Sequence, residues 1–186
     1  MNFIDNHDVP RFLWRNSDPR ALRAALAYLL TEDGIPCLYY GTEQEFAGGN
    51  DPSNREPLWW SEYRTDGETF RYVAQLNAAR RRYEALRRGS MSLTWTTDRV
   101  GDESDAGIVG FERVSGASYA LVVINAQGNH PSRTAFEGVA MATTAAPGSV
   151  LADVLSGDRF TVAPDGTLDV EVAPFAARIL VPDAEF

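Results

Sequence analysis

Two polar segments of the chain hold the residues best suited to chemistry. In the first, Asn6-His7-Asp8 follows the short run Phe3-Ile4-Asp5 and sets an amide, an imidazole and a carboxylate side by side. If the run ends a barrel strand, these side chains would face an active site, because polar residues at the carboxyl ends of barrel strands do so. A hydrogen-bonded turn explains the triplet equally well, so both interpretations stay open at this point.

The second segment, Gly48–Glu56, carries Asp51 and Arg55 on either side of a turn that contains proline. A carboxylate and a guanidinium at this spacing could form hydrogen bonds with neighbouring groups of a polyhydroxylated ligand. An ion pair between the two residues that fixes the loop is the alternative. The two roles are compatible.

The elements that would position these segments are α/β in character. Asp18-Pro19 predicts the start of a helix, since Asp18 can cap the first turn and proline suits the first helical position. Leucines at helical spacing continue to Leu30, and Gly34 is expected to end the helix. The apolar run Ile35–Tyr40 is typical of a parallel strand that is buried on both faces.

The irregular stretch from Gly41 to about Asp66 is longer than most loops of compact domains, which favours a functional role. A second helix is predicted from about Gly67 to Arg87, with Gly89 ending it. Within it, Arg80-Arg81-Arg82 is interpreted as a solvated helix face in preference to an anion site.

After Gly89 the composition changes to short β-rich runs separated by turn signals, which predicts an antiparallel sandwich or barrel of about six to eight strands. We therefore predict a domain boundary near residue 89, with domains at 1–89 and 90–186. The predicted strands are Ser92–Thr97, Gly107–Val114, Ser118–Asn125, Arg133–Gly138, Val150–Leu155, Arg159–Val162, Thr167–Val172 and Ala176–Val181.

Composition excludes several classes of protein. With 186 residues, 44% hydrophobic and 23% charged, the chain is neither disordered nor fibrous. A net charge of −9 argues against nucleic acid as a partner, and no apolar run is long enough to predict a membrane span. One cysteine and two histidines offer no zinc cluster, so we expect no metal or other cofactor in this chain.

Taken together, Phe3–Asp8, Gly34–Gln44 and Gly48–Glu56 followed by Trp59 resemble the α-amylase family, glycoside hydrolase family 13. The resemblance is specific over residues 2–60 and reasonable to residue 88. It implies a fold that is α/β plus all-β: the C-terminal fragment of a (β/α)8 TIM barrel, from the end of strand seven to helix eight, followed by an antiparallel β-sandwich. It also implies an α-glucan or a maltooligosaccharide as the ligand.

By this resemblance, Asp8 matches the third catalytic carboxylate of the family, which is neither nucleophile nor acid. It would hold sugar hydroxyls and favour an oxocarbenium-like ring. His7 would bind hydroxyls in the same subsite, while Asp51 and Arg55 would grip a more distant glucosyl unit.

The family's nucleophile and general acid have no counterpart here, so we expect the chain to be inactive alone. The expected partners are the missing N-terminal part of the barrel or a second copy of the chain. The resemblance implies a calcium ion in the full-length parent and is compatible with secretion, but the sequence leaves localisation open. The alternative is a non-catalytic carbohydrate-binding or scaffold protein derived from the family.

Overall fold

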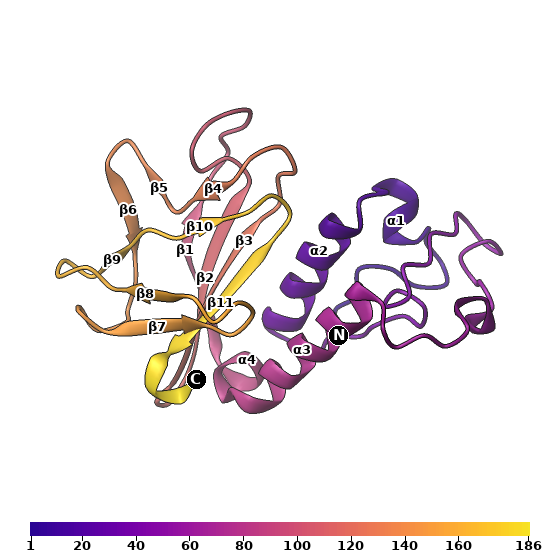
Figure 1. Ribbon diagram of the computed structural model, residues 1–186, viewed down its shortest axis with the longest axis horizontal. Helices are drawn as coiled ribbons and strands as arrows, with labels where there is room; N and C mark the ends of the chain where they lie inside the picture. The colour runs from indigo at the N-terminus through magenta and orange to yellow at the C-terminus, as the bar shows by residue number, and fades with distance from the viewer.

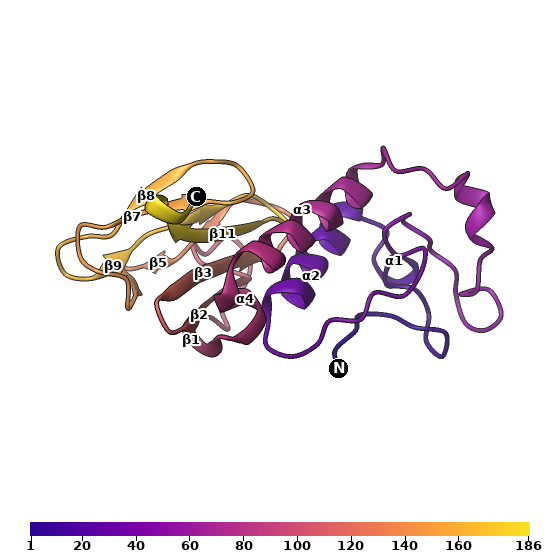
Figure 2. The same cartoon turned by 90° about the horizontal axis from the view of Figure 1, so that it is seen from below.

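The computed structural model describes residues 1–186. Figures 1 and 2 show three parts along its longest axis: the β-rich half, the helices α2, α3 and α4 beside it, and a group of irregular loops at the other end. The loops comprise the first residues of the chain and most of residues 37–66. They contain both polar segments singled out from the sequence.

The first long helix, α2, begins as predicted. Its N-cap is Asp18, whose side chain accepts a hydrogen bond from the Arg20 backbone N–H, and Pro19 occupies the first turn. The helices are α1 Phe12–Arg15, α2 Pro19–Thr31, α3 Glu68–Arg82 and α4 Glu84–Arg88, with 3-10 turns η1 at Leu58–Ser61 and η2 at Asp183–Glu185. None of them combines the length and hydropathy that a membrane span requires.

The predicted helix from Gly67 to Arg87 is two helices, because Tyr83 adopts an extended backbone conformation between α3 and α4. Tyr83 is almost fully buried there, so packing overrides the helical preference of the segment. The end of α2 also differs: Glu32 is the C-cap, and Gly34, with φ of +105°, lies beyond it.

The prediction of a regular strand at Ile35–Tyr40 is wrong, because the structure has no strand there. A single parallel bridge joins Asn2 to Pro36, through hydrogen bonds from Asn2 N–H to the Ile35 carbonyl (2.9 Å) and from Cys37 N–H to the Asn2 carbonyl (2.7 Å). The two segments thus run side by side in the expected direction. No further strand lies beside them, and Ile35 is 71% exposed, so the pairing does not extend into a ladder.

Within residues 90–186 every pairing between strands is antiparallel, as predicted for this region. The main sheet has the order β1-β2-β3-β11-β7-β8, and two small sheets have the orders β10-β4 and β5-β6-β9. The strands are β1 Ser90–Thr96, β2 Ile108–Ser115, β3 Ser118–Asn125, β4 Ser132–Arg133, β5 Ala135–Phe136, β6 Val139–Ala142, β7 Val150–Asp153, β8 Arg159–Thr161, β9 Thr167–Leu168, β10 Glu171–Val172 and β11 Ala177–Pro182. The predicted strands Arg133–Gly138 and Thr167–Val172 are each split, and their halves pair in different sheets.

The main sheet is buried on both faces. Along β3, Ala120, Val122 and Ile124 belong to the core shared with the helices, whereas Leu121 and Val123 belong to the core shared with the small sheets. Successive side chains of a strand point to opposite faces, so one strand contributes to both cores. The helices α2, α3 and α4 therefore form a layer on one face of the sheet.

Two arginines reinforce this layer where α2 ends. Arg113 on β2 is buried and donates hydrogen bonds to the carbonyls of Thr31 and Gly89. Arg80 on α3 donates to the carbonyls of Leu30 (2.9 Å) and Gly34 (2.7 Å), and also to those of Glu32 and Leu86. The predicted solvated face therefore holds for Arg81 and Arg82, which are exposed, and not for Arg80. The domain boundary near residue 89 remains a prediction, since both sides of it share a core.

Candidate functional site

The segment that carries Asn6-His7-Asp8 is anchored by Asp5. Asp5 is 2% exposed, and its carboxylate accepts hydrogen bonds from the Thr42 hydroxyl (2.8 Å) and the Phe12 backbone N–H (3.2 Å). It thereby joins the first residues of the chain to the segment after Tyr40. A buried carboxylate needs such partners, because leaving it unpaired would be costly.

Arg11 is the second anchor, and its side chain is fully buried. Its guanidinium donates to the Glu56 carboxylate (3.1 Å) and to the Tyr40 carbonyl (2.7 Å), and it lies over the Tyr39 ring at 4.1 Å from the centroid. Glu56 in turn accepts a hydrogen bond from the Gly48 N–H (2.5 Å). The Arg11–Glu56 ion pair therefore holds both ends of the Gly48–Glu56 loop against Arg11, the N-cap residue of α1.

Asn54 connects the two polar segments directly. Its side chain is fully buried, and its amide nitrogen lies within hydrogen-bonding distance of the carbonyls of Val9 (2.8 Å), His7 (3.0 Å) and Asn6 (3.4 Å). The loop that bears Asp51 and Arg55 is therefore held against the loop that bears His7 and Asp8. We call residues 6–9 and 51–56 together the paired loops.

His7 and Asp8 lie in a turn at the surface. The Asp8 N–H donates to the Asn6 side-chain oxygen (2.7 Å), which confirms the hydrogen-bonded turn. His7 Nε2 lies 3.3 Å from Asp8 Oδ1, and the two side chains are 57% and 70% exposed. The turn leaves most of the imidazole and the carboxylate accessible, so it is compatible with a ligand-binding role for both.

Asp51 and Arg55 form the ion pair that was the structural alternative, with 2.6 Å between Asp51 Oδ1 and Arg55 Nε. The side chains are 59% and 49% exposed, so solvent screens the pair and the interaction alone contributes little to stability. The remaining oxygens and nitrogens are free to meet a ligand. An ion pair of this kind presents a donor group and an acceptor group together.

Tyr39 lies between the two anchors and the exposed residues. Its ring is 6.4 Å from the His7 ring and 4.7 Å from the Tyr40 ring, centroid to centroid. Burial raises the pKa of the Tyr39 phenol above its usual value. The group is therefore neutral near pH 7, as a hydroxyl that can donate or accept a hydrogen bond.

The sequence singled out the exposed residues of this site but not the buried ones that hold them. Arg11, Asn54 and Glu56 belong to no recognisable motif, and each contacts residues that are distant in the sequence. The one available signal was the position of Asn54 and Glu56 on either side of Arg55. No group of three or more His, Cys, Asp or Glu side chains is arranged to hold a metal ion.

No family model matches the chain. It is 33% identical to α-amylase 2 of Schwanniomyces occidentalis over 181 residues, which cover 97% of this chain and 34% of that protein. It is 35% identical to the cyclomaltodextrin glucanotransferase of Bacillus sp. (strain 1011) over 167 residues, which cover 89% of this chain and 22% of that enzyme.

Among solved structures, it superposes on an α-amylase from Malbranchea cinnamomea with a TM-score of 0.81 and 29% identity, covering 99% of this chain and 37% of that one. The α-amylase from Geobacillus thermoleovorans, solved with acarbose, gives a TM-score of 0.80 at 28% identity and covers 96% and 38%.

These matches are to enzymes of glycoside hydrolase family 13. Its homologues are α-amylases and cyclomaltodextrin glucanotransferases, and the matched part is their C-terminal region. The chain spans about a third of the length of the curated α-amylases that it matches and less of the glucanotransferases. The resemblance inferred from the residues is thus confirmed at the level of the family.

Proposed function

We propose that this chain is the C-terminal part of a retaining glycoside hydrolase that acts on α-1,4-linked glucans. In this proposal residues 1–89 complete a (β/α)8 barrel and residues 90–186 form its C-terminal β-domain. The observation that carries the proposal is the contact made by Asn54, which brings four exposed residues of sugar-binding type onto adjoining loops. The homologues named α-amylase support the choice of glucan.

Each of the four residues has a role that its exposed atoms permit. Asp8 accepts hydrogen bonds from two sugar hydroxyls, and His7 adds a donor or an acceptor beside it. Hydrogen bonds from hydroxyls to a carboxylate strengthen as the ring gains positive charge, so Asp8 stabilises the transition state more than the ground state. Asp51 and Arg55 bind a glucosyl unit further along the chain and set its register.

Retaining hydrolysis also needs a carboxylate nucleophile and a general acid about 5 Å apart. We assign both to the part of the relatives that this chain does not cover. Residues 1–186 alone therefore bind glucan without cleaving it. A non-catalytic glucan-binding protein is the alternative that this proposal must be tested against.

The binding half of the proposal is tested on the 186-residue chain with maltoheptaose, followed by NMR. Amide signals of the paired loops should shift, and Asp8→Asn and Arg55→Ala should each weaken binding at these loops. Asp33→Asn, which changes an exposed carboxylate outside the paired loops, is the matched control. Shifts confined to other residues would contradict the assignment.

The catalytic half needs a longer protein that includes the nucleophile and the acid. There Asp8→Asn should lower kcat by about two to four decades with little change in KM, because it removes a preorganised charge that acts in the transition state. Arg55→Ala should mainly weaken binding of long substrates. An unchanged kcat in Asp8→Asn would show that the catalytic role assigned to Asp8 is wrong. Absence of turnover by the unaltered longer protein would favour the non-catalytic alternative. Release of sugar from p-nitrophenyl maltooligosaccharides by the 186-residue chain would show that the catalytic pair is not missing.

A further inference from the structure

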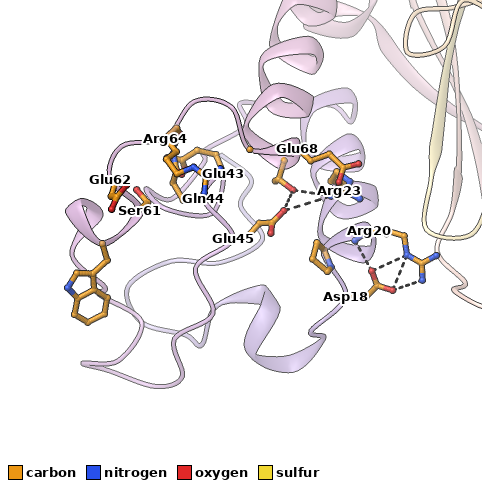
Figure 3. Close-up of a pocket in the computed structure, with 14 residues that line it drawn as sticks. Asp18, Arg20, Arg23, Glu43, Gln44, Glu45, Ser61, Glu62, Arg64 and Glu68 are labelled. Carbon is orange, nitrogen blue, oxygen red and sulfur yellow. Dashed lines mark hydrogen bonds and ion pairs between the residues drawn. The ribbon is translucent and has the colours of Figure 1, made fainter.

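A second concave surface lies outside the paired loops. It is a hollow of about 750 Å³ between the first turn of α2, residues 43–45, and the stretch from η1 to the first turn of α3 (Figure 3). None of its fourteen lining residues belongs to the paired loops, and Trp60 is its one hydrophobic residue. Since sites for drug-like ligands are lined mainly by apolar side chains, this lining indicates a strongly polar ligand.

The charges of the hollow argue against an anion. Five carboxylates and three guanidinium groups line it, which makes the lining net negative. Arg23 is already engaged, because its Nη1 lies 3.4 Å from Glu68 and 3.8 Å from Glu45. Figure 3 shows these three side chains grouped on one side of the hollow. A phosphate or sulfate would therefore meet more repulsion than attraction.

The hollow nevertheless offers both acceptors and donors that lack partners. One carboxylate oxygen of Glu43 is buried without any hydrogen bond, and such atoms are rare in folded proteins. On the donor side, the N-cap of α3 is Gly67, which has no side chain to cap the helix, so N–H groups of its first turn have no partner within the helix. A hydroxyl group can satisfy either kind, because it both donates and accepts.

Trp60 adds an apolar surface at the same place. It belongs to η1 and is 67% exposed, so one large flat ring borders an otherwise polar hollow. The adjacent Trp59 is 64% exposed and does not line the hollow. A pyranose ring combines hydroxyl groups with an apolar C–H face, and the face packs against an aromatic ring.

We propose that this hollow binds a stretch of α-glucan and so forms a second glucan site beside the paired loops. The hollow itself calls for a neutral, polyhydroxylated ligand with an apolar face. The choice of an α-glucan among such ligands rests on the proposed function. In this assignment the sugar packs on Trp60, and its hydroxyls bind Glu43 and the start of α3.

The neighbouring tryptophans supply a matched test on the 186-residue chain. Maltoheptaose is titrated into the unaltered protein, Trp60→Ala, Trp59→Ala and Arg55→Ala, with binding followed by NMR and by calorimetry. Trp60→Ala should weaken the binding reported by residues 43–45 and 67–69 about five- to tenfold, the range expected for loss of one aromatic contact. Trp59→Ala should change it less than twofold.

Arg55→Ala separates this proposal from the previous one. If the hollow is a glucan site, binding reported by residues 43–45 persists in Arg55→Ala, whether or not the paired loops also bind. Equal losses in Trp59→Ala and Trp60→Ala would overturn the proposal, and so would shifts confined to the paired loops. The proposal would also be overturned if inorganic phosphate shifted the signals of residues 43–45 and maltoheptaose did not.

Discussion

The two ends of the molecule are held together by different forces. In the β-rich half and the helices beside it, two continuous apolar cores lie on opposite faces of one sheet. In the loop region almost no regular structure exists (Figure 2). Buried polar side chains make the connections there. The most deeply placed of these, Arg11 and Asn54, have no accessible surface.

The difference shows how this chain holds exposed functional side chains in defined positions. Apolar contacts are non-directional and stabilise a fold without fixing single atoms. Hydrogen bonds from a buried amide or guanidinium are directional, and breaking one leaves a buried donor or acceptor without a partner. The region that must present His7, Asp8, Asp51 and Arg55 is therefore held by side chains that specify atomic positions.

The largest effect should come from the apolar core. Phe111 on β2 is fully buried and contacts the Tyr28 ring edge-on, so Phe111→Ala should lower the free energy of unfolding by about 3–5 kcal/mol. Leu93→Ala is the control, since Leu93 pairs with Phe111 across the sheet but is 64% exposed. It should cost less than about 0.5 kcal/mol. Urea denaturation of both variants measures the free energy of unfolding. Equal losses in the two variants would mean that Phe111 does not lie in the apolar core.

A smaller loss should follow from removing the Arg80 side chain, which binds carbonyls at and beyond the end of α2. Arg80→Ala takes hydrogen bonds from four carbonyls and should lower the free energy of unfolding by about 2 kcal/mol. Arg81→Ala, in the exposed neighbour, should change it by less than about 0.5 kcal/mol. Denaturation curves recorded side by side make the comparison. A loss in Arg81→Ala as large as that in Arg80→Ala would show that net charge, and not the hydrogen bonds of Arg80, matters.

In the loop region, Asn54→Ala should act locally. It leaves three carbonyls without their donor, so we expect a loss of about 1–2 kcal/mol and faster hydrogen exchange at residues 6–9 than in the sheet. The exposed Asn50 lies four residues earlier, and Asn50→Ala should leave exchange unchanged. If Asn54→Ala also made exchange faster throughout the main sheet, the claim that Asn54 acts only in the loop region would be wrong.

The smallest effect concerns a polar contact within the β-rich half. His130 Nδ1 lies 2.7 Å from the Pro131 carbonyl and Nε2 lies 2.6 Å from the Gly101 carbonyl, which raises the pKa of His130 above its ordinary 6.5. Asp102 is the nearby carboxylate and acts in the same direction. Only the imidazolium donates from both nitrogens.

The favourable contribution of His130 is therefore fully present below about pH 6.5 and is lost as the pH rises through the raised pKa. The stability difference between the unaltered chain and His130→Gln should shrink between pH 6 and pH 9. An NMR titration of the His130 ring should give a midpoint above 6.5. A midpoint at or below that value would show that the two carbonyl contacts are absent in solution.

What the sequence predicted well was local. Asp18-Pro19 marked the start of α2 because capping depends on two adjacent residues, and the β-rich runs from Ser118 and Ala176 marked β3 and β11. The break at Tyr83 and the splitting of two predicted strands depend on packing partners far along the chain. A sequence pattern read over about ten residues carries no information on those distant packing partners.

The site shows the same limit. Its exposed residues were found because their types and spacing resemble a family motif. Asn54 was not, since its importance lies in the carbonyls of residues 6, 7 and 9, which are more than forty positions away. A buried asparagine and an exposed asparagine look alike in a sequence, so the residue that joins the paired loops emerged from the structure.

The position of β11 has a consequence for biosynthesis. This strand, the last one in the chain, lies between β3 and β7 in the middle of the main sheet, as Figure 1 shows in yellow. During translation β1, β2 and β3 can pair as they emerge, but the inner edge of β3 stays open until Pro182 has left the ribosome. Open strand edges invite association with other nascent chains. We therefore expect a stop codon before residue 177 to yield an aggregated product instead of a shortened domain.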